Sequence, residues 1–432
     1  MLYSKKLEKS CLRIALVSDF FCPNTGGIET HLYYLGGCLL ERGHKVIVIT
    51  HAYGRRKGIR YLSNGLKVYY LPFLVVYNST TLSAVVDCLY WFRKIFLHEK
   101  IQIVHGHSSF SSMAHEAILH AWCLGIRTIF TDHSLFGFAD ASAILTSKLL
   151  LRYSLANVDK AICVSHTSKE NLVLRAGLSP SNVFVVPNAI ETSLFLPDPE
   201  KFYSNTTTVV ILSRLVYRKG ADLLVDIIPL VCQQHPKVRF LIAGDGPKRV
   251  ELEEMREKHK LHNRVIMLGM LPHDKVREVM VEGQIFLNTS LTEAFCMSIV
   301  EAACCGLHVV STKVGGVPEV LPSELVILED TIPSRLSEGV LQAIYLRETN
   351  QLMDPSKRHE MVKKMYNWQD VAARTEIVYE TAIATPQSSL KTRMKNYLKG
   401  GICFGLVWSY MALINLIFIF ILNVFNPVKD EP

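Results

Sequence analysis

Short apolar and β-branched runs alternate with longer helical patterns along this chain, and this alternation limits the folds open to it. The first series contains RIALVS, HKVIVIT, KVYYLP, IQIVHG, RTIFTD, KAICVS and VFVVPN. Helical patterns between these runs include residues 28–42, 80–98 and 111–124. Nearly continuous apolar strands separated by helices are typical of a parallel sheet covered on both faces. We therefore predict an α/β fold.

A polar, proline-containing stretch at residues 191–208 interrupts this alternation. A second series follows it, with TVVILSR, VRFLIAGDG, RVIMLG, QIFLNTS and HVVSTKVGG. The sequence predicts doubly wound, Rossmann-like domains at residues 1–190 and 208–365, then a terminal helix and basic segment at 366–399. Ligands of such open sheets bind beyond the carboxyl ends of the strands, so we expect the site in a cleft between the domains.

The C-terminal part of the chain has the length and apolarity of a membrane span. No charged residue occurs from Gly400 to Val428, and residues 401–425 are long enough to cross a bilayer as one helix. Four cations precede this segment without an acid: Lys391, Arg393, Lys395 and Lys399. The positive-inside rule then places residues 1–399 in the cytoplasm. A buried core helix is the alternative. Asn415, near the middle, either bonds a neighbouring helix or its own backbone.

Composition narrows the function classes. Apolar residues make up 49% of the chain and charged residues 20%, as in an ordered globular protein. The net charge is +8, but the cations are scattered and do not form a stripe with aromatic residues, which disfavours nucleic acid as a partner. The eleven cysteines include no Cys-x-x-Cys pair and no zinc spacing, which indicates a reducing compartment.

Two motifs follow the first strand of each series. Gly26 and Gly27 stand between a strand and a helix, where a backbone can approach an anion at the helix N-terminus. Their spacing is neither a dinucleotide fingerprint nor a P-loop, and a simple tight turn is an equal interpretation. Arg214 and Lys219, in SRLVYRKG, suit a diphosphate at the end of a strand. Solvated surface is the alternative for these cations.

Two glutamates stand in an otherwise apolar segment, LTEAFCMSIVEAACCG. The pattern predicts a helix over AFCMSIVEAACCG, with Thr292 helping to cap it and Gly306 near its end. Glu293 then lies in the preceding turn and Glu301 about two turns inside the helix. Burying a carboxylate is costly unless something pairs with it, and a ligand rich in hydroxyl groups would do so.

Metal chemistry is not expected from the sequence. The chain has no Asp-x-Asp triplet, which transferases that hold a nucleotide diphosphate through a divalent metal commonly present. We therefore expect no cofactor and no metal, with phosphate charge neutralised by side-chain cations and helix N-termini. His105 and His107 end a predicted strand, but their spacing requires no metal.

These motifs together resemble the retaining GT-B glycosyltransferases of sequence family 4. The resemblance is closer to one family within them, the catalytic subunits of phosphatidylinositol N-acetylglucosaminyltransferase. It covers roughly residues 12–385 and the apolar C-terminal helix, and it rests on VSDFFCPNTGGIETH, THAYGRRKGIRYL, TDHSLFGFAD, SRLVYRKG and LNTSLTEAFCMSIVEAA. It implies a GT-B fold of two Rossmann-like domains facing a cleft, plus one C-terminal transmembrane helix.

The resemblance also implies roles for individual residues. The expected catalytic group is Glu293 at the donor sugar, His133 near the transferred sugar, and Arg214 and Lys219 at the diphosphate. Glu301 is expected to hold the ribose of UDP. The other donor-binding residues implied by the family are Gly26, Gly27, Phe295, Cys296 and Met297. Many relatives have glycine where this chain has Cys296.

The implied reaction is transfer of N-acetylglucosamine from UDP-GlcNAc to phosphatidylinositol with retention, the first step of GPI-anchor biosynthesis. A same-face attack as UDP departs is expected, and a double displacement stays open. The implied setting is the endoplasmic reticulum membrane, with a single pass, a cytoplasmic catalytic domain, a lumenal tail and partner subunits. The alternatives are a related membrane-associated retaining glycosyltransferase with another lipid acceptor, or a non-catalytic scaffold protein of the same complex. NAD-dependent chemistry is disfavoured because the glycine fingerprint is absent.

Overall fold

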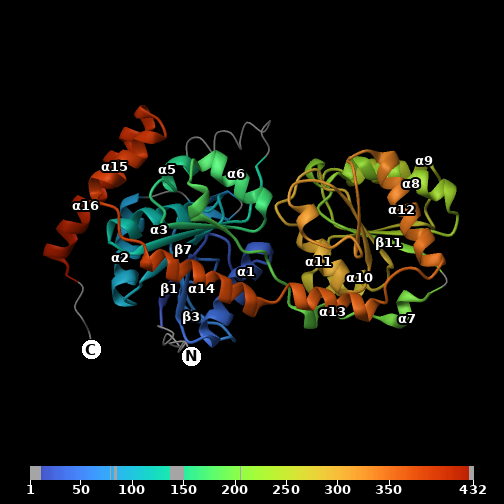
Figure 1. The fold of residues 1–432 in the computed structure, drawn as a ribbon, viewed down its shortest axis with the longest axis horizontal. Helices are drawn as coiled ribbons and strands as arrows, with labels where there is room; N and C mark the ends of the chain where they lie inside the picture. The colour runs from blue at the N-terminus through green and yellow to red at the C-terminus, as the bar shows by residue number, and fades with distance from the viewer. Residues whose placement is uncertain (1–10, 78, 82–84, 137–149, 205, 428–432) are drawn as a thin grey trace, which may run out of the picture. The chain divides into compact units, whose positions relative to one another are not determined.

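The computed structural model describes residues 11–427 except 78, 82–84, 137–149 and 205. The chain forms two compact units, shown as ribbons in Figure 1. Unit 1 comprises Met1–Cys163, Lys169–Val186 and Gln369–Pro432, and unit 2 comprises Val164–Ser168 and Pro187–Trp368. The chain therefore returns to unit 1 after completing unit 2.

Unit 1 is built on an eight-stranded sheet in the order β10-β9-β8-β7-β1-β2-β4-β3. All neighbouring strands are parallel except β3 and β4. The strands are β1 (Arg13–Val17), β2 (Lys45–His51), β3 (Gly58–Tyr61), β4 (Lys67–Leu71), β7 (Ile103–His107), β8 (Arg127–Asp132), β9 (Lys160–Cys163) and β10 (Val183–Val185). A separate hairpin pairs β5 (Val75–Tyr77) with β6 (Thr80–Thr81).

Helices cover this sheet because its strands are buried along almost their whole length. The helices are α1 (Gly27–Glu41), α2 (Val85–His98), α3 (Ser112–Cys123), the short α5 (Arg152–Ser154), α6 (His166–Ala176) and α14 (Trp368–Ala384). Phe92 and Phe96 of α2 pack with Ala117 of α3 in one core cluster that also contains Val17 and Ile49 of the sheet. Burial of these side chains holds the helix layer on the sheet.

Unit 2 contains a six-stranded, fully parallel sheet in the order β13-β12-β11-β14-β15-β16. Its strands are β11 (Thr208–Leu212), β12 (Arg239–Ala243), β13 (Val265–Gly269), β14 (Ile285–Asn288), β15 (His308–Thr312) and β16 (Val326–Glu329). Its helices are α7 (Pro199–Phe202), α8 (Ala221–Gln234), α9 (Arg249–Lys258), α10 (Val276–Met280), α11 (Met297–Cys304), α12 (Pro333–Glu348) and α13 (Pro355–Met365). The β11–β14 pair at the centre places two loops side by side at the carboxyl ends of these strands.

The structure confirms the two predicted α/β series, since every predicted strand run contains a strand. The helix predicted over 80–98 is shorter, because α2 begins at Val85 and β6 occupies Thr80–Thr81. The prediction around the glutamates was wrong in two details. Helix α11 begins at Met297, so Glu301 lies about one turn inside it, and the N-cap is Cys296 without a side-chain bond, so Thr292 is not the cap.

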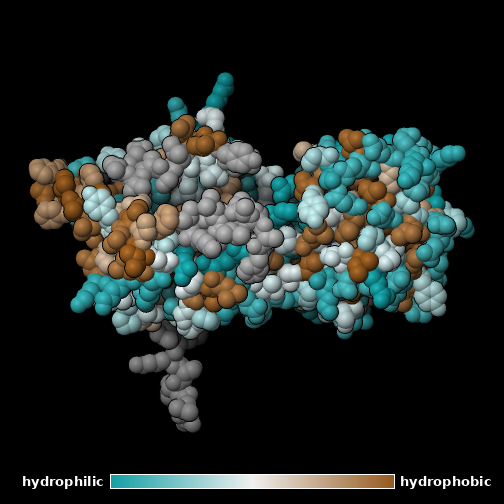
Figure 2. All heavy atoms as spheres, turned by 90° about the horizontal axis from the view of Figure 1, so that it is seen from above, coloured by the Kyte–Doolittle hydropathy of each residue, from teal (hydrophilic) through white to brown (hydrophobic). Residues whose placement is uncertain are grey.

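Two helices end the described chain, α15 (Leu390–Lys399) and α16 (Ile402–Phe425). Within the described ranges, α16 is the one helix long and apolar enough to cross a membrane by length and composition. Figure 2 shows hydrophobic side chains gathered over it, at the left. Its opposite face packs on unit 1, where Arg93 donates to Asn423 Oδ1 at 2.7 Å. Asn415 donates to the carbonyl of Met411 at 3.0 Å, which is the bond to its own backbone.

Candidate active site

The loops after β11 and β14 bring Lys219 and Glu293 into contact. The Lys219 ammonium donates to Glu293 Oε1, and Ser290 Oγ donates to the same oxygen at 2.9 Å. Both charged side chains are mostly buried, with 27% and 13% of their surfaces exposed. Among the described residues, no group donates to the second carboxylate oxygen, Oε2. Glu293 is thus neutralised on one side and able to accept a ligand hydroxyl on the other.

The backbone fixes the two loops against each other. Thr289 Oγ1 donates to the carbonyl of Lys219 at 3.0 Å, and Leu291 N donates to the carbonyl of Arg218 at 2.9 Å. Gly220 adopts a left-handed conformation, with φ of 67°, and a Cβ there would lie 1.8 Å from the carbonyl oxygen of Thr289. Only glycine fits this close approach without moving the Thr289 backbone.

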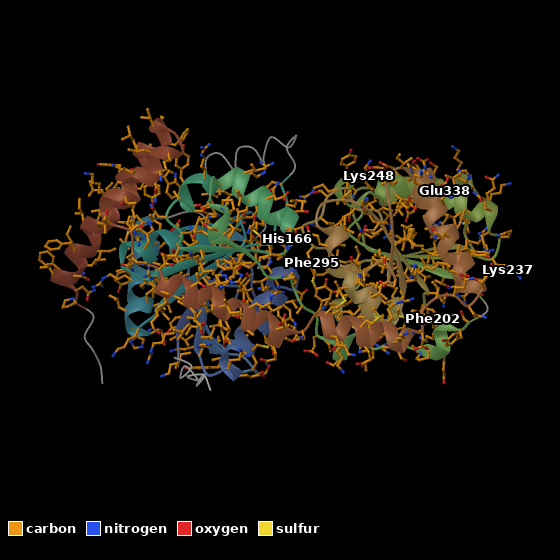
Figure 3. The ribbon with its side chains drawn as sticks, viewed as in Figure 1. His166, Phe202, Lys237, Lys248, Phe295 and Glu338 are labelled. Atoms are coloured by element: carbon orange, nitrogen blue, oxygen red, sulfur yellow. The ribbon has the colours of Figure 1, made fainter. Side chains whose placement is uncertain are left out.

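The start of α11 is irregular and tightly packed. Cys296 has a φ of 69°, a left-handed conformation that explains why glycine is suited to this position. Phe295, labelled in Figure 3, is buried and meets the ring of Tyr366 edge-on, with centroids 5.5 Å apart. Gly316 N donates to the carbonyl of Glu293 at 2.9 Å. These contacts hold Met297, the first helical residue, at the end of the Glu293 loop.

Glu301 is partly buried in α11, and burial raises the pKa of its carboxyl to about 7. No described side chain pairs with it or donates a hydrogen bond to it. A carboxylate in such surroundings is costly to ionise, so it gains most from a ligand that donates hydrogen bonds. Arg214 lies two residues beyond β11 with its side chain exposed, and it forms no ion pair within the described part of the chain. The structure therefore joins Lys219 to Glu293 by a hydrogen bond but does not join Arg214 to either glutamate.

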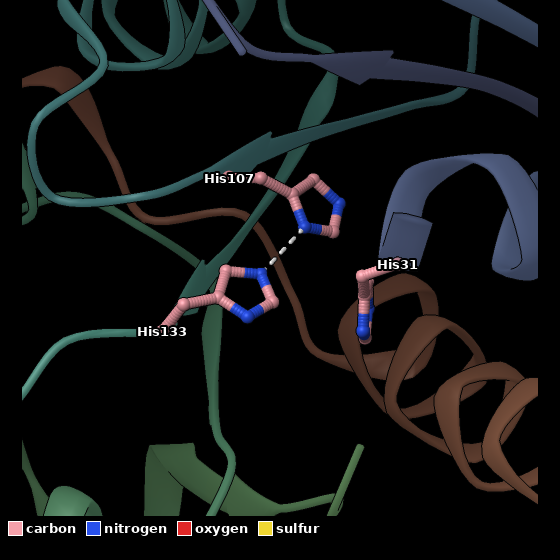
Figure 4. A group of neighbouring side chains, drawn as sticks. All are labelled: His31, His107 and His133. Carbon is pink, nitrogen blue, oxygen red and sulfur yellow. Dashed lines mark hydrogen bonds between the residues drawn. The ribbon is translucent and has the colours of Figure 1, made fainter. Parts of the chain in front are cut away.

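In unit 1, the carboxyl ends of β7 and β8 face the first turns of α1. Gly26 is the N-cap of α1 and Gly27 its first residue. Figure 4 shows His31 of α1 with its ring near those of His107 and His133. His107 Nδ1 lies 3.4 Å from His133 Nε2, and one ring nitrogen from each histidine lies within 4.8 Å of the other two. Three nitrogens at this spacing are able to hold a metal ion.

Burial and neighbouring imidazoles lower the pKa of His107 and His133 well below the ordinary value, so both rings are neutral at pH 7. His105 does not belong to this group of nitrogens. Its Nδ1 lies 2.8 Å from the hydroxyl of Tyr379 and its Nε2 lies 2.6 Å from Thr131 Oγ1, both inside the core. His105 therefore has a structural place between the sheet and α14.

Sequence reasoning missed three polar residues in this part of unit 1. His31 lies four residues after Gly27, one helical turn further along α1, and this spacing was the available signal. Asp19, after β1, accepts from Ser111 Oγ at 2.7 Å and anchors the start of α3. Asp132, at the end of β8, accepts from a serine hydroxyl at 2.8 Å, and burial raises its pKa to about 6. No local sequence pattern marks these two acids.

Comparison with known proteins adds to this geometry. Residues 51–140 match the family described as PIGA (GPI anchor biosynthesis), and residues 195–368 match the family Glycosyl transferases group 1. One of the subunits of phosphatidylinositol N-acetylglucosaminyltransferase from Arabidopsis thaliana is 52% identical over 423 residues, 98% of this chain and 94% of that protein. The Homo sapiens protein of the same name is 52% identical over 415 residues, 96% of this chain and 85% of that protein.

A solved structure shows the same fold at much lower identity. Anabaena HepE, determined in complex with UDP and glucose, superposes with a TM-score of 0.67 at 18% identity. The match covers 87% of this chain and 100% of the HepE chain. The structural likeness and the match to Glycosyl transferases group 1 confirm the predicted GT-B fold.

Proposed function

The chain belongs to the PIGA family of phosphatidylinositol N-acetylglucosaminyltransferase subunits, glycosyltransferases of GPI-anchor biosynthesis, and we propose that it transfers N-acetylglucosamine from UDP-GlcNAc to phosphatidylinositol with retention. The observation that carries this proposal is the 52% identity to a relative across 98% of the chain. Such extensive similarity includes both units and the C-terminal helices.

The proposed donor site uses the loops of unit 2. Lys219 and Arg214 offset the charge of the diphosphate, and the first amides of α11 add hydrogen-bond donors. Glu293 accepts a hydroxyl of the sugar with its free oxygen, while Lys219 holds the other oxygen. Glu301 accepts the hydroxyls of the ribose. No metal is needed in this scheme, because two cations already stand near the expected phosphates.

The proposed chemical step exchanges one bond at the anomeric carbon for another on the same face. The bond to the UDP oxygen breaks as its developing charge is stabilised by Arg214 and Lys219. The inositol hydroxyl forms the new bond and gives up its proton. His133, which is neutral, is placed near the transferred sugar as a hydrogen-bonding group and not as a cation.

Membrane attachment is proposed through α16, with the basic α15 on its cytoplasmic side. We place the enzyme in the endoplasmic reticulum membrane as part of a multi-subunit complex, with the C-terminal tail in the lumen. In the structure α16 lies along unit 1, with Asn423 held by Arg93 near its end. Crossing the bilayer therefore requires α16 to leave this surface.

A transfer assay on the purified membrane complex tests the proposal. Labelled UDP-GlcNAc should label phosphatidylinositol, whereas Glu301→Ala and Arg214→Ala should reduce transfer at least about 100-fold because each removes a donor contact. Glu278→Gln is a matched control, because this exposed glutamate pairs with Lys275 on the surface. Labelling of a different lipid would favour the alternative acceptor, and retained transfer in both variants would refute the donor site.

A further inference from the structure

A cavity of about 300 Å³ lies in unit 1 beside α15, outside the candidate active site. Its walls come from the start of α5, from the segment around Asn157 to Lys160, from Leu178 to Asn182, and from α15 up to Gly400. None of the proposed donor or catalytic residues lines it. Its volume is at the small end of the range for ligand sites.

Four cations line the cavity: Arg152, Lys160, Arg393 and Lys399. None of them forms an ion pair with any residue that the structure describes. Lys160 Nζ donates to Asn182 Oδ1 at 2.7 Å, and Lys399 Nζ donates to Asn396 Oδ1 at 2.9 Å, so both have neutral partners.

One carboxylate also lines the cavity, that of Asp159. It is already engaged by Arg127, whose Nη1 lies 3.3 Å from its Oδ1, and by the backbone N–H of Thr128 at 2.8 Å. The walls therefore carry an excess of positive charge that no described protein group offsets. A concave site with this charge favours an anion.

The walls are fixed by hydrogen bonds and do not depend on loose surface side chains. Trp122 Nε1 donates to the buried hydroxyl of Tyr397 at 3.1 Å, which anchors α15 on α3. Asn157 donates to the carbonyl of Arg393 at 3.1 Å and accepts from Asn396 at 3.1 Å. Arg393 itself is buried, with its guanidinium 4.9 Å from the ring of Trp122.

The cavity opens where the chain turns apolar. Gly400 lines it, and Ile402, Phe404 and Leu406 at the start of α16 are exposed by 75%, 45% and 57%. We propose that this cavity binds the phosphate headgroup of an anionic glycerophospholipid whose acyl chains lie along the exposed face of α16. The proposal rests on the membrane attachment proposed above and not on the transfer reaction.

Lipid binding to the full-length chain in an uncharged detergent tests this proposal. The probes are dioctanoylphosphatidylserine, which is anionic and is not the proposed acceptor, dioctanoylphosphatidylcholine, and inorganic phosphate. The pocket variant is Arg152→Gln with Lys399→Gln, both exposed residues whose replacement should leave the fold intact. The matched control is Lys391→Gln with Lys395→Gln, which removes the same charge from α15 outside the cavity.

We expect the serine lipid to bind at least about tenfold more tightly than the choline lipid, and the pocket variant to lose about tenfold in that affinity. The control variant should stay within about twofold of the parent chain. Equal weakening in the control, equal binding of both lipids, or displacement of the lipid by phosphate at equal concentration would each overturn the proposal. UDP-GlcNAc transfer is measured separately, so failure of the proposed reaction leaves this result intact.

Discussion

Donor binding should weaken as the pH falls, because Glu301 must be ionised to accept both ribose hydroxyls. Burial raises the pKa of this carboxyl to about 7, so a large fraction is protonated at pH 6 and almost none at pH 8. UDP-GlcNAc does not change its own charge in this range, since both phosphates are diesters. The pH dependence of the KM for UDP-GlcNAc therefore reports on the protein.

The expected size follows from the pKa. If only the carboxylate binds, the apparent KM scales with one plus the ratio of protonated to ionised Glu301. That factor is about 11 at pH 6 and about 1.1 at pH 8, a tenfold change. Glu301→Gln should raise the KM at pH 8 and abolish the pH dependence, while the exposed Glu278→Gln keeps the parent profile.

A stability measurement separates this role from a merely structural one. Because the pKa of Glu301 is raised from its ordinary value of 4.5, the folded protein holds a proton that the unfolded chain releases. The free energy of unfolding then falls as the pH rises from 4.5 to about 7 and is level above it. Glu301→Gln should therefore stabilise the protein at pH 8 by about 1–3 kcal/mol and have little effect at pH 4.5. A destabilised variant, or a KM that is flat between pH 6 and 8 in the parent enzyme, would refute this reasoning.

Three further predictions test other features. Gly220→Ala should lower the free energy of unfolding by more than about 2 kcal/mol, because its Cβ meets the Thr289 carbonyl at 1.8 Å; denaturant unfolding that leaves stability unchanged would contradict the geometry. Transfer should survive dialysis against EDTA; loss of activity that Zn²⁺ or Mn²⁺ restores would instead assign a metal to His31, His107 and His133. A glycosylation acceptor added after the C-terminus should be modified if α16 crosses the membrane, and an unmodified tag would show that it does not.

Local sequence patterns were sufficient to predict the strands and most helices, because apolar periodicity reports directly on burial. They did not indicate where α14 packs. Glu376 of α14 accepts from Arg42 at 2.7 Å, and Tyr379 lies 2.8 Å from His105, across more than half of the chain. Such pairings depend on the completed sheet of unit 1 and leave no local signal. The exposed edge strand β3 was missed for the opposite reason, since it has no buried face.

The site shows the same division. Motif spacing identified Lys219 and Glu293 as candidates, but only the loop geometry reveals that they pair and that Ser290 joins them. The predicted cap at Thr292 was wrong because propensity favours a hydroxyl at an N-cap, whereas the close packing around the Glu293 loop places Cys296 there. The roles assigned to these residues stay predictions until donor binding is measured.

Unit 2 carries two features in this site that cost stability and that the fold itself does not require. Cys296 holds a left-handed backbone that costs a residue with a Cβ about 1 kcal/mol or more, and Glu301 holds a carboxyl that no described side chain pairs with. Both lie in the first two turns around the start of α11, beside the paired Glu293. Uncompensated terms of this kind concentrate where a ligand supplies the missing contacts. Their coincidence in one short segment argues for a bound nucleotide sugar on physical grounds that are independent of sequence similarity.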